Sequence, residues 1–360
     1  MPHTRLAALT LLCLSAIVAS ACRDAARQTA VAAAQTAATT RPPARQVVNA
    51  NTVTRRSILL QSDAASAWQV EAIALTRRTL FVADAVRDSV LAYDLDNDGV
   101  HLDRVDRRIN SLRTKRALLG AHSDSTVLLL DRDRQLLHVL HENGALLNSW
   151  RWQMKGEAAG ACVANDSTVF VFLLTPTGYR TMRLTKSGSA VTESVTAEPW
   201  PGYYEQHRLT AHVLASAPVN NGACVFGHLF DRGLVLLRAD APPVSVPWIE
   251  MLKPPAAIVE STTVGQTTRR VESVQSADRG PRAIAVSGDS VLVLFEGKQK
   301  YANTQLDVYD ASTRTYRHSL RFAERIESVA ASSTGIALLI KNRGRISVWV
   351  LVVNAPDRAK

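Results

Sequence analysis

The sequence predicts an all-β protein built as a closed ring of six similar units. Three observations support this prediction. The same order of short strands and polar turns recurs six times between residues 68 and 353, the recurring runs are aliphatic, and helical spacing with capping residues is almost absent. Aliphatic runs bounded by Asp, Ser, Gly and Asn are typical of strands buried on both faces. This pattern is that of a six-bladed β-propeller with four-stranded blades.

The first strand of each unit is rich in Ala, Gly and Ser. Six first strands converge on the axis of such a ring, so small side chains are expected there, with large aliphatic side chains in the next strand outward. The first strands are AIALT (72–76), ALLGAHS (117–123), AAGACVA (158–164), VLASAPV (213–219), AIAVSG (283–288) and VAASS (329–333). The second strands are TLFVAD (79–84), TVLLLD (126–131), TVFVFL (168–173), ACVFGH (223–228), SVLVLF (290–295) and GIALLI (335–340).

A third strand follows in every unit, but the sixth unit ends too early to hold a fourth. The third strands are VLAYD (90–94), LLHVL (136–140), TMRLT (181–185), LVLLR (234–238), LDVYD (306–310) and SVWVLVV (347–353). We predict that Arg56–Gln61 (RSILLQ), which lies before the first unit, supplies the missing outer strand and closes the ring. Closure removes exposed sheet edges that would invite aggregation. The alternative is a short strand without this role.

The amino terminus predicts export. Leu6–Val18 is an apolar run too short to span a bilayer, and Ala19-Ser20-Ala21 precedes Cys22. Small residues before a Cys resemble the bacterial lipoprotein box, which implies that Cys22 carries a lipid anchor and that the protein faces the periplasm or the cell surface. Cleavage by an ordinary signal peptidase after Ala21 is the alternative.

These features divide the 360 residues into four parts: a signal peptide (1–21), a lipid-anchored flexible tether (22–54), the propeller (55–354) and a short tail (355–360). The tether is assigned because its Ala, Thr, Gln and Arg residues offer little apolar surface for burial. Hydrophobic residues make up 46% of the chain, enough for a core. Closed propellers are commonly monomers, so we expect a monomer.

The net charge of +10 favours an anionic ligand or partner, although an Arg-rich composition alone also produces it. The turns between second and third strands carry basic residues but lack interleaved aromatic residues for base stacking, so we expect no nucleic-acid partner.

Two segments carry a family resemblance: FVAD…RDSVLAYDLDNDG (81–99) and LDVYD (306–310). They are similar to six-bladed propellers of the NHL and YWTD kind, although the YWTD tetrapeptide itself is absent. The resemblance implies a binding platform, since most such propellers bind ligands or proteins and a minority are lactonases, other hydrolases or oxidoreductases. Fold alone does not choose among these functions.

A binding site is expected on one face of the ring, called the upper face here. It carries the connections between blades and the turns between second and third strands. Long connections at Thr196–Arg208 and Ile249–Pro281 contribute to it, the former with Tyr203, Tyr204 and His207. Every turn between a second and a third strand also holds a basic residue. This arrangement suits an anionic partner or serves solubility alone. These are Arg87, Arg132, Arg134, Arg180, Arg232, Lys298, Lys300, Arg343 and Arg345.

Charged residues also interrupt the small first strands. Glu71, Arg282 and Glu327 lie eight residues before the second strand of their units, and Glu157 and His212 lie at nearly the same level. Two carboxylates at a channel mouth are the basis of an alternative function, a metal-dependent hydrolase or lactonase that resembles regucalcin-like enzymes and uses Glu71 and Glu327. A structural Glu–Arg network or a solvated mouth is the other interpretation.

Two further motifs have both a chemical and a structural interpretation. Asp94, Asp96 and Asp98 match the first half of a calcium loop, but a tight hairpin turn also favours Asp and Asn before Gly. Cys162 and Cys224 fall on a first and a second strand, an imperfect alignment that favours buried free thiols over a disulfide.

The sequence therefore predicts a non-enzymatic, lipid-tethered envelope propeller without a cofactor. Its upper face binds a ligand or partner protein, with Glu71, Arg282, Glu327, His212, Tyr203, Tyr204, His207 and Arg343 as candidate binding residues.

Overall fold

The structure is a computed structural model, and it describes residues 44–50, 55–60, 70–84, 89–96, 100–104, 118–132, 134–175, 178–188, 190–196, 213–219, 223–228, 233–249, 252, 256–264, 267–275, 278–297, 302–342 and 345–352. Within these ranges the chain forms strands and turns and no α-helix. No segment of this described part is a helix long and apolar enough to cross a membrane.

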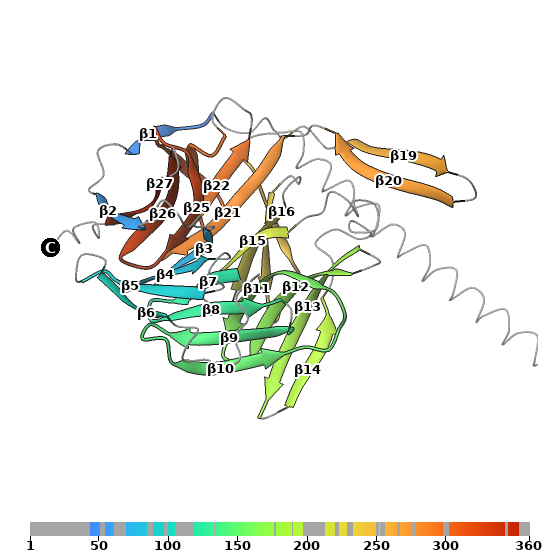
Figure 1. Ribbon diagram of the computed structural model, residues 1–360, viewed down its shortest axis with the longest axis horizontal. Helices are drawn as coiled ribbons and strands as arrows, with labels where there is room; N and C mark the ends of the chain where they lie inside the picture. Colours follow the sequence, from blue (N-terminus) through green and yellow to red (C-terminus); the bar gives the residue numbers. More distant parts are fainter. Residues whose placement is uncertain are drawn as a thin grey trace, which may run out of the picture. The chain divides into compact units, whose positions relative to one another are not determined.

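Six sheets make up a six-bladed β-propeller, as the repeat predicts (Figure 1). Their first strands, β3, β7, β11, β15, β21 and β25, gather around a common centre. Blade one is β3 (Val70–Leu75), β4 (Thr79–Asp84), β5 (Ser89–Asp94) and β6 (Val100–Arg104); blade two is β7 (Leu118–Ser123), β8 (Thr126–Asp131), β9 (Leu136–His141) and β10 (Leu146–Arg151); blade three is β11 (Glu157–Asn165), β12 (Thr168–Thr175), β13 (Gly178–Ser187) and β14 (Ala190–Val195).

The remaining blades complete the ring and bring in strands from the amino-terminal side. Blade four is β15 (Val213–Val219), β16 (Ala223–His228), β17 (Gly233–Arg238) and β18 (Val244–Pro247); blade five is β21 (Arg279–Ser287), β22 (Ser290–Gly297), β23 (Gln305–Asp310) and β24 (Tyr316–Arg321), with β1 (Val47–Asn49) beside β24; blade six is β25 (Ile326–Ala331), β26 (Gly335–Asn342), β27 (Arg345–Val352) and β2 (Arg55–Leu60).

The hydrophobic core lies between neighbouring blades, because each sheet packs face to face on the next. The second strands are the most deeply buried, and all six residues of β4 are buried. Large side chains such as Phe81 and Phe226 fill these layers, whereas Ala74 and Ala285 lie on the first strands. The small-to-large gradient in the sequence thus follows the widening of each blade from the axis outward.

The predicted ring closure is confirmed. Strand β2 pairs antiparallel with β27, with Arg55 opposite Leu351 and Leu60 opposite Ile346. Ile58 and Leu60 are buried in a cluster that includes residues of blades six and one. The first and last parts of the propeller therefore build one sheet together.

The propeller includes residues before residue 55. Residues 45–50, which fall within the expected tether, belong to the propeller: β1 runs parallel to β24, with Val47 opposite Ser319 and Asn49 opposite Arg321. Low apolar content predicted a tether, but Arg45 has a buried carboxylate partner far along the chain and Ala50 is buried. The expected signal peptide, Cys22 and the tail lie outside the described residues.

Cys162 and Cys224 form a disulfide, so the preference for free thiols was wrong. Their Cα atoms are 6.1 Å apart, and both residues are fully buried among Phe170, Phe172 and Phe226. The first strand of blade three packs on the second strand of blade four because neighbouring blades are stacked and twisted. Different strand numbers therefore do not keep two cysteines apart.

Part of the long connection between blades four and five forms its own hairpin. Strands β19 (Ala256–Val264) and β20 (Thr267–Gln275) pair antiparallel as a separate two-stranded sheet. The other long connection, Thr196–Arg208, lies outside the described residues after Thr196.

Candidate functional site

Five of the first strands share an irregularity near the end at which they begin. The register shifts by one residue there, so that a single extra residue bulges from the strand. Bulges near a rim redirect a side chain away from the regular alternation of the sheet. The extra residues are Glu71, Ala159, Leu214, Arg282 and Glu327. The three charged positions that the sequence aligns are thus three equivalent bulges.

Two of these charged residues contact each other. Arg282 Nε donates a hydrogen bond to the Glu327 carbonyl oxygen at 2.9 Å, and Arg282 Nη2 donates to Glu327 Oε2. On the other side, Arg325 Nε lies 3.2 Å from Glu327 Oε1. Both carboxylate oxygens of Glu327 therefore face a guanidinium, which is the Glu–Arg network considered from the sequence. Arg325 was missed because it falls outside the repeated pattern.

Beneath this network lies a cavity of about 150 Å³ on the axis. Its described lining is mostly small or aliphatic, including Ala72, Gly120, Ala161 and Ser328, and Arg282 is the charged member of that lining. Pockets for drug-sized ligands typically measure roughly 300–1,000 Å³. The cavity is therefore small for an organic ligand, and binding at this end of the axis would involve its mouth.

The upper face brings together the elements expected there. The β8–β9 turn contacts the connection from blade two to blade three: Gln135 Nε2 donates to the Met154 carbonyl at 2.9 Å. At the same place Arg132 Nη1 lies 3.7 Å from Glu157 Oε1, and the Glu157 side chain is 47% exposed. Turns between second and third strands and inter-blade connections thus share a face.

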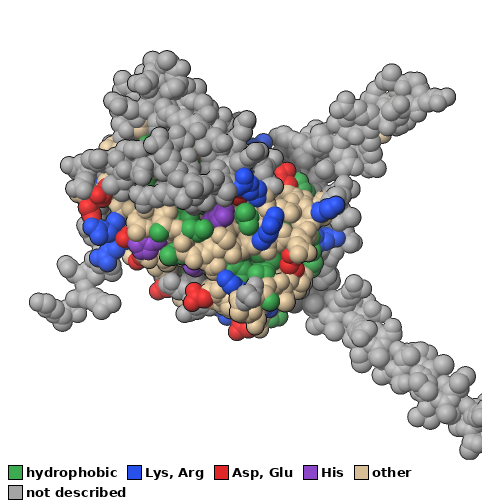
Figure 2. Space-filling model, turned by 60° about the horizontal axis from the view of Figure 1, so that its bottom comes forward, with side chains coloured by type: hydrophobic (Ala, Val, Ile, Leu, Met, Phe, Trp, Pro, Cys, Tyr) green, Lys and Arg blue, Asp and Glu red, His purple; other side chains and the backbone are tan. Residues whose placement is uncertain are grey.

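The basic residues of this face are only partly described. Arg134 Nε lies 4.0 Å from Asp131 Oδ2, and Arg180 Nη1 donates to the Tyr179 carbonyl at 3.0 Å. Basic and acidic side chains occur side by side on the described surface in Figure 2. His212, Tyr203, Tyr204, His207 and Arg343 lie outside the described residues, as does the side chain of Glu71.

The acidic loop of blade one has the contacts of a turn. Asp94 Oδ1 accepts a hydrogen bond from the Asp96 backbone N–H at 2.9 Å, and Asp96 Oδ2 forms an ion pair with Arg78 Nε at 2.8 Å. Asp98 lies outside the described residues. Within the part of the chain that the structure describes, no three His, Cys, Asp or Glu side chains are grouped closely enough to hold a metal ion.

The opposite face, called the lower face here, carries an open cavity of about 710 Å³ lined by Arg77, Arg78, Asp96, Asp124, Ser125, Glu142 and Thr334. Hydrogen bonds connect the turns between first and second strands of blades one, two and six here. The Arg77 backbone N–H donates to the Asp124 carbonyl at 2.7 Å, and Asp124 Oδ1 accepts from the Ser333 backbone N–H at 2.8 Å.

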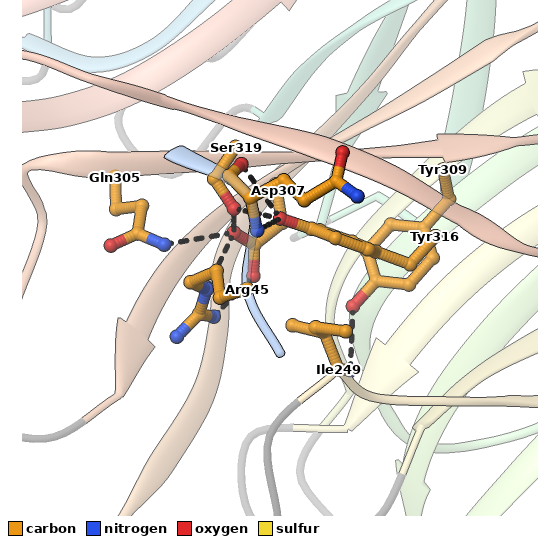
Figure 3. Close-up of polar contacts among 8 residues, drawn as sticks. Arg45, Ile249, Gln305, Asp307, Tyr309, Tyr316 and Ser319 are labelled. Carbon is orange, nitrogen blue, oxygen red and sulfur yellow. Dashed lines mark hydrogen bonds and ion pairs between the residues drawn. The ribbon is translucent and has the colours of Figure 1, made fainter. Parts of the chain in front are cut away.

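Blade five contains a buried polar cluster that the sequence did not reveal (Figure 3). Asp307 is fully buried, and its carboxylate is bound by Arg45, whose Nη2 lies 2.6 Å from Oδ2. Ser319 Oγ and Gln305 Nε2 also donate to Asp307 Oδ1, at 2.6 and 3.2 Å. The available signal was the Asp within the otherwise apolar strand LDVYD, but nothing in the sequence connects it to Arg45.

Two tyrosines extend this cluster. Burial raises the pKa of the Tyr309 phenol far above its usual value, and the Ile249 backbone N–H donates to its oxygen at 3.1 Å. Burial also raises the pKa of Tyr316, whose hydroxyl lies 2.7 Å from Ser319 Oγ. Both phenols therefore stay neutral and serve as hydrogen-bonding groups.

No protein-family model matches the chain, and no curated protein matches it in sequence. Solved structures with a similar fold include the Cps50 (Swd1) β-propeller domain of Myceliophteria thermophila, at 13% identity over 82% of this chain and 100% of that one, with a TM-score of 0.48. Virginiamycin B lyase from Staphylococcus aureus is 10% identical over 83% of this chain and 99% of its own, with a TM-score of 0.48. Hydrazine synthase of Kuenenia stuttgartiensis is 9% identical over 83% and 100%, with a TM-score of 0.47. At these identities the likeness concerns the fold alone.

Proposed function

We propose that this chain is an exported protein of the bacterial cell envelope, anchored through a lipid on Cys22, and that its propeller binds a partner protein or an anionic ligand at the upper face. The leader sequence supports export. So does the buried Cys162–Cys224 disulfide, because such bonds persist mainly in oxidising compartments.

The observation that carries the binding site is the Arg282–Glu327–Arg325 network at the bulged ends of the first strands. A network whose charges are already paired holds its side chains in place before a partner arrives, and this lowers the ordering cost of binding. The Arg325 side chain is 60% exposed, so it is accessible to a partner while Nε is held by Glu327. Because both Glu327 oxygens face guanidinium groups, we favour binding over metal-assisted hydrolysis.

The binding proposal is tested by using the purified full-length protein as bait in envelope extracts. We expect a retained protein or anionic ligand to be lost in Arg325→Ala, because this change removes the exposed arginine of the network on the upper face. The matched control is Arg78→Ala, because Arg78 is similarly exposed but lies on the lower face. This variant should retain the partner. Equal loss with the control variant would place the binding site elsewhere.

The anchor is tested separately with Cys22→Ser. The wild-type protein should be recovered with membranes and carry the mass of a diacylglyceryl group on its mature first residue. The variant should appear in the soluble envelope fraction. Continued membrane association of the variant would contradict lipid anchoring and leave the binding proposal to its own test.

A further inference from the structure

The outer edge of blade five binds an extended segment in an unusual way for this molecule. Among the described sheets, only this blade has a fifth strand, and that strand, β1, lies parallel to its neighbour β24 over three residue pairs. Val47 and Val48 are 42% and 50% exposed. So short and exposed a strand gains little from burial of its own side chains, and its attachment depends on the residues at its two ends, Arg45 before it and the buried Ala50 after it.

Arg45 provides that attachment. Its Nη2 and Nε reach the two carboxylate oxygens of Asp307, at 2.6 and 3.3 Å, and its guanidinium lies 5.1 Å from the centre of the Phe295 ring. A planar guanidinium can bind both oxygens and stack on an aromatic face at once, whereas an ammonium group cannot. The slot formed by Asp307 and Phe295 therefore selects arginine over lysine.

The next residue is recognised through its backbone. Gln46 N–H donates to the Tyr316 hydroxyl at 3.1 Å, and the Ser319 backbone N–H donates to the Gln46 carbonyl at 2.7 Å. The Tyr316 hydroxyl lies 2.7 Å from Ser319 Oγ, which in turn donates to Asp307 Oδ1 at 2.6 Å. The Arg45 side chain and, through Tyr316 and Ser319, the Gln46 backbone are thus connected to one buried carboxylate. Figure 3 shows Arg45, Tyr316 and Ser319 around Asp307.

We propose that the outer edge of blade five is a peptide-binding site for an arginine followed by an extended, β-forming segment, and that residues 45–50 occupy this site as an intramolecular strap. Edge pairing supplies sequence-independent hydrogen bonds, and the Asp307 slot supplies selectivity, as in other binding by strand addition. Because the strap is part of the same chain, its effective concentration is high and it excludes peptides in solution. A segment of the same chemistry from another protein binds only when the strap is displaced.

The first test uses the full chain with the strap weakened by Arg45→Ala and Val48→Pro. The probes are a labelled peptide of residues 44–50, Ala-Arg-Gln-Val-Val-Asn-Ala, and the same peptide with Ala in place of Arg. We expect the variant to bind the first peptide at least ten-fold more tightly than the second, and the wild-type protein to bind neither. Equal binding of the two peptides, or no binding by a variant that melts cooperatively, would overturn the proposal.

A second test does not require an empty site. Trypsin cleavage after Arg45 should be slow in the wild-type protein and at least ten-fold faster in Asp307→Asn, because the neutral amide cannot hold the guanidinium. Asp310→Asn, on the same strand, is the matched control and should be cut like the wild type. Unchanged cleavage in Asp307→Asn, or equal acceleration after Arg321 of β24, would contradict a strap that is released through Asp307.

Discussion

At the scale of single residues, buried charge and buried imidazole determine how the propeller responds to substitution and to pH. Asp307 is fully buried and depends on Arg45, whereas the Arg78–Asp96 pair has both side chains more than half exposed. Removing one partner of a buried pair leaves an uncompensated charge, while an exposed pair is weakened by solvent and salt.

We therefore expect Arg45→Ala to lower the free energy of unfolding by about 3 kcal/mol. Arg78→Ala should leave it nearly unchanged. Urea denaturation of both variants at neutral pH measures the two effects. Similar midpoints for the two variants would show that Asp307 is satisfied without Arg45.

His138 gives the residue-scale prediction for pH. Burial lowers the pKa of this imidazole below 6.5, with Asp131 opposing the effect and Arg134 adding to it. Its Nδ1 lies 2.9 Å from Ser149 Oγ inside blade two. The unfolded chain takes up a proton at a higher pH than the folded one, so stability is lost as the pH falls below 6.5.

Melting curves recorded between about pH 7.5 and pH 5 would follow this loss of stability, because an ordinary His titrates in this range. We expect the melting temperature of His138→Gln to decline less steeply than that of the wild type, because one titrating group has been removed. Parallel declines would show that other groups, such as the similarly shifted His122 and His318, account for the whole effect.

At the scale of elements, the amino-terminal strands are outer strands of two different blades. Strand β2 completes blade six, and Ile58 and Leu60 are 5% and 1% exposed. Strand β1 contributes mainly polar contacts to blade five. The two strands follow one another in sequence but have different roles, one in the hydrophobic core and the other at an edge.

Deletion of residues 1–60 should therefore be more damaging than deletion of residues 1–43. The longer deletion removes the buried side chains of Ala50, Ile58 and Leu60 and the Arg45 partner of Asp307. It also exposes the backbone of β27, an open edge that favours association with other chains. Size-exclusion chromatography and thermal melting should show aggregation and a lower melting temperature for the longer deletion alone. A monomeric, equally stable product would show that β2 is dispensable for closure.

At the scale of the whole molecule, much of the ring could be predicted because its physics is local and repeated. Strands β4, β8 and β16 begin and end at the predicted residues, since their aliphatic runs are bounded by polar turns. The disulfide, β1 and the Arg45–Asp307 pair could not be predicted in the same way. They depend on residues that meet only after the blades have stacked, and Arg45 and Asp307 are 262 positions apart.

The candidate site was foreseen only in part. Equal spacing from the second strands placed Arg282 and Glu327 at equivalent positions, and both are bulged residues near the axis. Spacing could not show that Glu327 is bound by two arginines, because Arg325 has no counterpart in the repeat. The aromatic residues of the Thr196–Arg208 connection remain predictions.

The disulfide gives the whole-molecule prediction. It links blades three and four across 62 residues, and closing a loop of that length in the unfolded chain corresponds to about 4 kcal/mol. Replacing both cysteines by Ala should lower the melting temperature by roughly 10 °C and abolish its response to reductant. A wild-type protein whose melting temperature is indifferent to reductant under unfolding conditions would contradict this estimate.

The position of β2 has a further consequence for how the protein is made. Strand β2, which completes blade six, is synthesised before the first strand of blade one, and its partner β27 is synthesised after all the other strands of the propeller. No nascent chain that still lacks β27 can therefore form the complete sixth sheet, however many earlier blades have folded. Pairing across such a separation is slow because a long loop must close first. Blade six is thus the last sheet that can be completed, and a chain truncated before β27 leaves β2 without its partner.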